Sequence, residues 1–159
     1  MKLLQPKYRI KKIEEFEITK IIENNYKIII FDLNNTVIDY YTDTIPNGTK
    51  EYILKLKELG IKVYIISNSF DNKMIKNVAN KLDVSYINKA FKPFPFAVKK
   101  VLKKENITNN NALVIGDHII TDILVANICK IDSVLVLPLN KNEKFHSKIA
   151  RKFENLLLK

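Results

Sequence analysis

The sequence predicts an α/β fold, in which a doubly wound, mostly parallel sheet of five strands carries helices on both faces. Short apolar runs rich in isoleucine and valine alternate along the chain with longer amphipathic segments. Strands that alternate with helices form βαβ units, which build parallel sheets covered by helices. The chain has 159 residues, only 3 Gly and 5 Pro, and no linker-like stretch, so we expect one domain over residues 1–159.

The first half of the chain supplies two predicted strands and two helices. Residues 26–33 (YKIIIFDL) form a continuous β-branched and aromatic run, typical of a fully buried strand. Residues 49–59 have apolar side chains at helical spacing, and Gly60 is a plausible C-cap. A second buried strand is expected over 61–67, followed by an amphipathic helix over 71–82.

The second half continues the alternation. We expect short strands at residues 84–87, 112–116 and 133–137. A basic helix over 96–105 and a short helix over 121–128 separate them. The core therefore spans 28–137, between an N-terminal extension (1–25) and a C-terminal segment (143–159) that is expected to be helical.

Composition excludes some classes of protein. The single cysteine, Cys129, excludes a disulfide framework and a cysteine-based zinc site. The first residues lack the apolar core of a secretory signal, and no apolar run approaches the ~20 residues of a membrane span. We therefore expect a cytoplasmic protein, soluble or peripheral to the inner face of the membrane.

The net charge of +10 favours anionic partners such as phosphorylated substrates, anionic lipid or nucleic acid. The bases are 25 Lys and only 2 Arg, beside 24 Ile and 18 Asn, and codons for Lys, Ile and Asn are rich in A and T. Part of the bias is therefore genomic. Nucleic-acid sites usually rely on arginine forks as well as lysine, so nucleic acid is the less favoured partner.

Three polar residues end predicted strands: Asp32, Ser67 and Asp117. Ligands of such sheets bind beyond the carboxyl ends of the strands, so these side chains should face one crevice. Asp122 adds a third carboxylate, and clustered carboxylates repel unless a cation lies between them. Oxygen ligands suit Mg²⁺, which commonly binds carboxylates together with phosphate and water.

Further residues suit a bound phosphate. Ser67 and Asn68 offer a hydroxyl, an amide and backbone N–H groups, and Lys92 offers a positive charge. A carboxylate nucleophile, a metal, a hydroxyl and a lysine together fit phosphoryl transfer through an aspartyl-phosphate.

Four stretches resemble, in order, the motifs of the haloacid dehalogenase superfamily of phosphohydrolases. They are IFDLNNTV at 30–37, IISN at 65–68, KP at 92–93 and GDHIITD at 116–122. Each is weak alone, but the ordered set in the expected structural context is a strong signal. The segment around 6–8, the Asn-Thr pair at 35–36 and the KPFP sequence at 92–95 narrow the resemblance to the YqeG type of phosphatase. That family lacks a cap domain and is related to phosphatases that act on phosphatidylglycerophosphate in phospholipid synthesis.

The resemblance implies a role for each residue. Asp32 would be the nucleophile. Mg²⁺ would be held by Asp32, by the backbone carbonyl of Asn34 and by Asp117, with Asp122 supporting the metal indirectly. Ser67 and Lys92 would bind the phosphoryl oxygens, with help from Asn68. The substrate would be a phosphomonoester, with a lipid headgroup as the leading candidate.

Asn34 departs from the family pattern, which usually has a second aspartate at this position. That aspartate protonates the leaving group and then activates water, which an amide does not do. The site is therefore expected to bind Mg²⁺ and phosphate but to turn over slowly. Three explanations stay open: an engineered change, natural drift towards a pseudoenzyme, or compensation by another group such as His118 or water.

No predicted insertion is long enough for a cap domain, so an open crevice suited to a bulky substrate is expected. Six lysines without an intervening acid occupy the region of the third motif, interleaved with Phe91, Phe94 and Phe96. The lysines are Lys89, Lys92, Lys99, Lys100, Lys103 and Lys104. This composition could seat the protein on an anionic bilayer, although a solvated helix face is as good an interpretation.

Two alternatives to the phosphatase stay open. One is a catalytically weak or inert domain of the same superfamily that binds a phosphorylated partner, which Asn34 favours. The other is a protein that binds nucleic acid or processes its ends, which charge alone favours.

Overall fold

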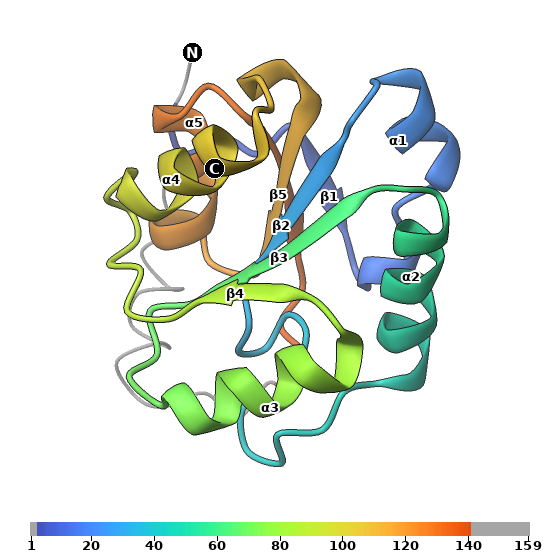
Figure 1. Cartoon of the computed structure of the whole chain (residues 1–159), viewed down its shortest axis with the longest axis vertical. Coiled ribbons are helices and arrows are strands. Elements are labelled where there is room, and N and C mark those ends of the chain that lie inside the picture. Colours follow the sequence, from blue (N-terminus) through green and yellow to red (C-terminus); the bar gives the residue numbers. More distant parts are fainter. Residues whose placement is uncertain (1–2, 141–159) are drawn as a thin grey trace.

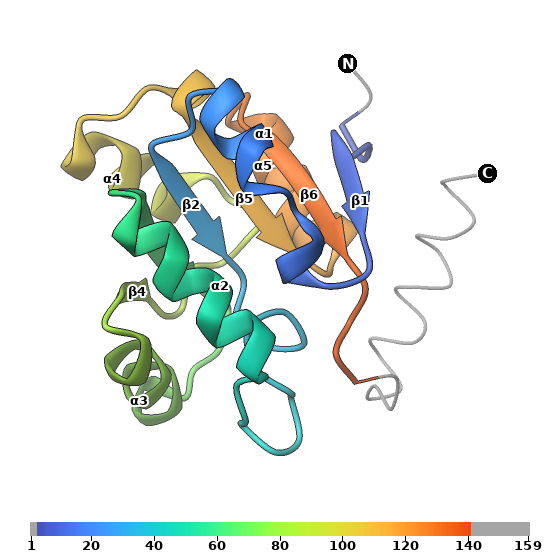
Figure 2. The same ribbon diagram turned by 90° about the vertical axis from the view of Figure 1, so that its right-hand side faces the viewer.

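The computed structural model describes residues 3–140, which build a parallel six-stranded sheet in the order β1-β6-β5-β2-β3-β4 (Figures 1 and 2). All five strand pairings are parallel. The strands are β1 (Tyr8–Ile10), β2 (Ile28–Phe31), β3 (Lys62–Ile66), β4 (Ser85–Ile87), β5 (Ala112–Gly116) and β6 (Asp132–Val136). The predicted fold class is confirmed, and the predicted number of five strands is wrong by one.

The additional strand, β1, comes from the segment expected to be an extension. It pairs with β6 at the edge of the sheet, with Tyr8 opposite Val134. The first and last residues of β1 are partly buried and the middle one is exposed. A strand of three residues is also too short to show a hydrophobic period. The same segment forms helix α1 (Ile18–Glu23), whose Ile21 enters the core.

Helices cover both faces of the sheet. The helices are α1, α2 (Asn47–Glu58), α3 (Asn72–Leu82), α4 (Phe96–Glu105) and α5 (Leu124–Ile128), with 3-10 turns at Ile13–Glu15 and Asn109–Asn111 and a π-helical turn at Ile119–Ile123. One core cluster joins α1, α2 and α3 to the sheet, and another joins α4 and α5 to the opposite face. Figure 2 shows α1 and α2 in front of the strands.

The sequence of the central strand β2 has no polar alternation because both faces of the strand are buried. Ile29 and Phe31 enter one core cluster, while Ile28 and Ile30 enter the other. Successive side chains of a strand point to opposite faces, and here helices cover both. All four residues are buried, as expected for the middle of a doubly wound sheet.

The predicted helix over 121–128 is wrong in its first half. Residues Ile119–Ile123 form a π-helical turn, and α5 begins only at Leu124. The backbone N–H groups of Asp122 and Ile123 both donate to the carbonyl of His118, at 2.9 and 3.3 Å. The wider turn carries a buried Asp122, and such turns often occur at functional sites.

No cap domain is present among the described residues. The connection from β2 to α2 spans 32–46, and that from β3 to α3 spans 67–71, so both are too short to fold independently. The helix expected over 143–159 lies outside the described residues. Within 3–140, no helix combines the length and apolarity that a bilayer crossing requires.

Candidate active site

The carboxyl ends of β2, β3 and β5 meet at one edge of the sheet, as the sequence predicted. A pocket of about 270 Å³ opens there. Its lining includes six of the seven predicted site residues: Asp32, Asn34, Asn68, Lys92, Asp117 and Asp122. The seventh, Ser67, is buried beneath the pocket edge at the end of β3 and does not line the pocket.

Lys92 is the cationic centre of this pocket. Its Nζ lies 2.7 Å from Oδ1 of Asp32 and 2.6 Å from Oδ1 of Asp122. The side chains of Lys92 and Asp122 are 5% and 1% exposed, and that of Asp32 is 13% exposed. One ammonium group therefore contacts two carboxylates, and the three side chains are poorly exposed to water.

This arrangement changes the acidity of both partners. Burial raises the pKa of Asp32, and Asp122 raises it further, while the charge of Lys92 opposes both effects. The pKa of Asp32 is about 6 as a result. Burial lowers the pKa of Lys92, but the attraction of Asp122 and Asp32 outweighs it and leaves that pKa above its ordinary value. Lys92 is therefore charged at neutral pH.

Asp122 uses both carboxylate oxygens within the protein. Oδ1 faces Lys92, and Oδ2 accepts the backbone N–H of His118 at 3.1 Å. A Cβ atom on Gly116 would overlap this carboxylate, so the glycine at the end of β5 provides the space for it. Glycine permits this close approach because it has no side chain.

A tight turn after β2 brings the first motif together with Asp117. The hydroxyl of Thr36, which is buried, donates to Oδ1 of Asp117 at 3.2 Å. Asn35 has a φ of 60°, in the left-handed region that asparagine tolerates better than most residues. The turn is closed by the N–H groups of Val37 and Ile38, which donate to the carbonyl of Leu33 at 2.9 and 3.1 Å.

Oxygen atoms in this pocket fit a divalent cation. Asp32, Asp117 and Asp122 each offer a carboxylate oxygen, and these atoms lie within 4.8 Å of one another. Oδ1 of Asn34 is buried and accepts no hydrogen bond among the described residues. An all-oxygen donor set suits Mg²⁺ better than the softer transition metals.

Asn68 positions the loop that carries Lys92. Its side-chain Oδ1 accepts the backbone N–H of Lys92 at 2.7 Å, and its Nδ2 donates to the backbone carbonyl of Lys92 at 2.9 Å. Both ends of the amide are therefore engaged with the chain. The hydroxyl of Ser67 accepts the N–H of Ser69 at 3.1 Å, which shapes the turn that follows β3.

Asn35 and Thr121 line the pocket without having been assigned a site role from the sequence, and His118, which was named only as a group that could compensate for Asn34, lines it as well. Thr36 was not assigned a site role either, although it holds Asp117. Its place two residues after Asn34 in the first motif is the signal that could have indicated it. Asn35, His118 and Thr121 also lie inside motifs, but their residue types alone suggest ordinary surface positions.

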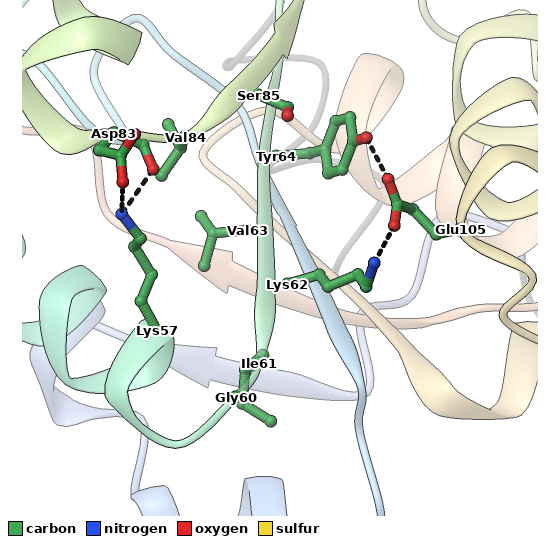
Figure 3. A pocket seen from close by; sticks show the side chains of 10 residues that line it. All are labelled: Lys57, Gly60, Ile61, Lys62, Val63, Tyr64, Asp83, Val84, Ser85 and Glu105. Carbon is green, nitrogen blue, oxygen red and sulfur yellow. Dashed lines mark hydrogen bonds and ion pairs between the residues drawn. The ribbon is translucent and has the colours of Figure 1, made fainter.

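A second hollow, of about 300 Å³, lies at the opposite edge of the sheet (Figure 3). Its charges are already neutralised. Nζ of Lys57 lies 2.7 Å from Oδ2 of Asp83, and Glu105 accepts hydrogen bonds from Lys62 and Tyr64. The first contact joins α2 to the turn after α3, and the others join α4 to β3, so we interpret this hollow as structural.

Comparisons with known proteins agree with the geometry. The family described as haloacid dehalogenase-like hydrolase matches residues 40–128, a range that includes Lys92 and Asp117 but begins after Asp32. The probable phosphatase YqeG of Bacillus subtilis (strain 168) is 31% identical over 160 aligned residues, covering 99% of this chain and 91% of that protein. This second match includes the first motif.

Solved structures support the fold. The cobalt-bound deoxy-D-mannose-octulosonate 8-phosphate phosphatase of Haemophilus influenzae has a TM-score of 0.57 at 15% identity, covering 85% of this chain and 88% of that one. The corresponding Moraxella catarrhalis phosphatase, in complex with magnesium, phosphate and KDO, has a TM-score of 0.53 at 19% identity and covers 64% of each chain. The family model and the relative from Bacillus subtilis, in contrast, show the family and confirm the resemblance drawn from the four motifs: the chain belongs to the haloacid dehalogenase-like hydrolase family.

Proposed function

We propose that the protein is a Mg²⁺-dependent phosphomonoester hydrolase that acts through an aspartyl-phosphate on Asp32. The observation that carries the proposal is the convergence of Asp32, Asp117, Asp122 and Lys92 in one pocket at the carboxyl edge of the sheet. Carboxylates and a lysine in a poorly hydrated site suit the binding of a metal and a phosphoryl group. The family and its phosphatase relatives support the same chemistry.

Asp32 is assigned the nucleophilic role. A carboxylate oxygen forms a bond to phosphorus, the bond from phosphorus to the leaving oxygen breaks, and the electron pair stays on that oxygen. Water then attacks phosphorus and releases inorganic phosphate, which restores the carboxylate. Lys92 orients Asp32 through its 2.7 Å contact and offers its positive charge to the phosphoryl oxygens.

The metal would be held by Asp32, Asp117 and the backbone carbonyl of Asn34. When bound, Mg²⁺ supplies charge stabilisation to the transferring phosphoryl group. Asp122 suits a supporting role, since Lys92 and the N–H of His118 already engage its two oxygens. The hydroxyl of Thr36 orients Asp117 through its hydrogen bond to Oδ1.

Asn68 and Ser67, which were both predicted to bind phosphate, are assigned different roles. Asn68 acts as a positioning residue for Lys92, because both ends of its amide are engaged with that residue's main chain. Its backbone N–H stays a predicted phosphate contact. Ser67 stays a predicted phosphate ligand that would have to reach the substrate from beneath the pocket edge.

Asn34 makes turnover slow in this proposal. Its amide neither donates a proton readily to a leaving alkoxide nor accepts one from water. General acid–base catalysis contributes about 10²–10⁴-fold to rates of this kind. The backbone carbonyl of residue 34 is the same for Asn and Asp, so the change affects proton transfer more than metal binding.

We propose phosphatidylglycerophosphate as the leading substrate. Support comes from the resemblance to the YqeG type and from the short connections after β2 and β3, which leave no cap over the pocket. An uncapped pocket admits a phosphate that is attached to a bulky group. The positive net charge also favours a substrate at an anionic surface.

Phosphate release with Mg²⁺ tests the proposal, with phosphatidylglycerophosphate and a generic aryl phosphate as substrates. We expect slow release by the protein, faster release by Asn34→Asp and none by Asp32→Asn. If neither the protein nor Asn34→Asp exceeds Asp32→Asn, the catalytic assignment fails for these substrates.

The amide of Asn34, in the place of a carboxyl group, favours one alternative, a domain that binds a phosphorylated partner without hydrolysing it. This alternative predicts Mg²⁺-dependent binding of phosphate to both the protein and Asn34→Asp, with no turnover by either. Isothermal titration with inorganic phosphate and Mg²⁺ measures this binding, and the absence of phosphate release by Asn34→Asp then separates the alternative from the phosphatase.

A further inference from the structure

Four phenylalanine side chains project into solvent beside the pocket. Phe70, Phe91, Phe94 and Phe96, which we call the aromatic rim, are 68%, 57%, 62% and 74% exposed. The other two phenylalanines of the described residues, Phe16 and Phe31, are buried in the core. A cluster of exposed rings is unusual for a monomer and commonly marks an interaction surface.

Two adjacent loops, one after β3 and one after β4, carry Phe70, Phe91 and Phe94 of the aromatic rim, and Phe96 begins α4 directly after the second loop (Figure 1). Backbone hydrogen bonds from Ala90 to Ser67 and from Lys89 to Ser69, at 3.0 and 3.1 Å, join them. The rings of Phe70 and Phe91 are 6.1 Å apart. The same loops supply two pocket residues, Asn68 and Lys92, so the rim borders the site.

Lysines surround the aromatic rim. Nζ of Lys89 lies 5.4 Å from the ring centroid of Phe70. Lys99 and Lys100 are exposed on α4, three and four residues after Phe96, and therefore lie on the same side of the helix. No acidic residue occurs from Val84 to Lys104.

Not all of the predicted basic stretch belongs to this surface. Lys104 lies over the ring of Tyr64, at 5.7 Å from its centroid, and lines a further hollow between β4 and α4 that Lys100 also lines. The nearest acid in sequence to Phe70 is Asp71, whose carboxylate accepts the N–H of Met74 and caps α3. The rim thus combines exposed aromatic rings with a local excess of positive charge.

We propose that the aromatic rim docks the protein on an anionic lipid bilayer. The rings would enter the headgroup region, where aromatic side chains are favoured, while the lysines would face anionic headgroups. The inference deepens the proposed function and rests on it, because docking through this surface brings the pocket to the phosphomonoester of a phospholipid. A nucleic acid is the weaker occupant, since arginine forks are lacking: Arg9 on β1 is the one arginine of residues 3–140.

Vesicle co-sedimentation tests the proposal with matched variants. The rim variant combines Phe70→Ser, Phe94→Ser and Phe96→Ser, and its control is Ile22→Ser, at a residue of α1 that is 64% exposed. The charge variant combines Lys89→Gln, Lys99→Gln and Lys100→Gln. Its control removes the same charge elsewhere, from the exposed Lys11, Lys12 and Lys50.

We expect the protein to bind vesicles that contain phosphatidylglycerol and to bind pure phosphatidylcholine vesicles weakly. The rim variant should bind the anionic vesicles at least about tenfold more weakly, since removal of one buried aromatic ring alone is worth that much. The charge variant should also lose binding, and both controls should retain most of it. Unchanged binding by the rim variant, or no binding by the protein itself, overturns the proposal. Binding of the protein to a single-stranded oligonucleotide that is lost in the rim variant, with no binding to vesicles, also overturns the proposal.

The catalytic assignment is tested separately in the same preparations. Rim variants should release phosphate from a soluble aryl phosphate at the unmodified rate, because the rings are exposed to solvent and do not line the pocket. Asp32→Asn should bind vesicles normally. Vesicle binding that depends on the rim, without any phosphate release, supports docking and refutes the proposed function. Phosphate release without rim-dependent vesicle binding supports the proposed function and refutes docking.

Discussion

Replacement of Lys92 by methionine would leave two buried carboxylates without their cation. Asp32 and Asp122 lie 2.7 and 2.6 Å from the ammonium group, and both side chains are poorly exposed. Removal of one partner from a buried ion pair typically costs about 3–5 kcal/mol. In a domain of this size each kcal/mol lowers Tm by roughly 2–4 °C, so we expect a decrease of roughly 6–20 °C in EDTA at pH 8.

The decrease should depend on pH. The pKa of Asp32 is about 6 with Lys92 present, and loss of the lysine removes the influence that lowers it. A carboxyl group whose pKa is higher in the folded protein destabilises the fold above that pKa, and the penalty disappears as the pH falls towards the unfolded value. The deficit of Lys92→Met should therefore shrink between pH 8 and pH 5, and Mg²⁺ should restore part of it at pH 8.

Thermal unfolding monitored by circular dichroism checks both expectations. Lys99→Met is the matched control, because this exposed lysine of α4 forms no ion pair among the described residues. Its Tm should change by no more than a few degrees. A Lys92→Met protein that is as stable as the control at pH 8 in EDTA, or whose deficit is the same at pH 5, would refute the reasoning.

Four further variants probe single features of the molecule. Asn34→Asp should raise kcat for an aryl phosphate by about 10²–10⁴-fold with little change in KM, because it restores a proton donor; an unchanged kcat would show that another group already does this work. Gly116→Ala should lower both activity and stability, the latter by about 1–3 kcal/mol, because its Cβ overlaps Asp122. Gly60→Ala, at a φ of 76° in open space, should lower stability alone. Glu105→Gln should lower the free energy of unfolding at pH 7 by less than about 1 kcal/mol, with a small decrease in Tm. The reason is that hydrogen bonds from its lysine and tyrosine partners lower the pKa of Glu105. Since a lowered carboxyl pKa stabilises the fold fully above the unfolded value and not at all below the folded one, the difference should disappear as the pH falls through the lowered pKa of Glu105.

The sequence predicted the sheet well because its strands are buried on both faces. Continuous apolar runs such as 28–31 occur only where helices cover a strand on each side, so they indicate both the strand and its central position. The edge strand β1 lacked this signal, since its three residues are partly exposed and lie between lysines. Its place beside β6 depends on a pairing between residues far apart in the chain.

The site was predictable in its residues and less so in their contacts. Asp32 and Asp117 could be placed at one edge because parallel strands bring their carboxyl ends together. Asn68 was expected to assist phosphate binding through its backbone or its amide, and the structure shows that the amide holds the main chain of Lys92 from the neighbouring loop. The π-helical turn at Asp122 was also hidden, since it depends on hydrogen bonds to His118 and Lys92 that no local pattern encodes.

The contacts of the pocket explain how one residue can separate binding from turnover. Asp32, Asp122 and Lys92 hold one another, and Thr36 holds Asp117, so none of these four groups depends on the side chain of residue 34. In the proposed metal site, residue 34 would contribute a main-chain carbonyl, which Asn and Asp share. A carboxylate at this position would add a group able to move a proton, and it would add one negative charge to the pocket that Asp32 and Asp117 line. We expect replacement of Asn34 by Asp to change kcat far more than the affinity for Mg²⁺ and phosphate, because the main-chain carbonyl and the contact between Lys92 and Asp32 stay in place.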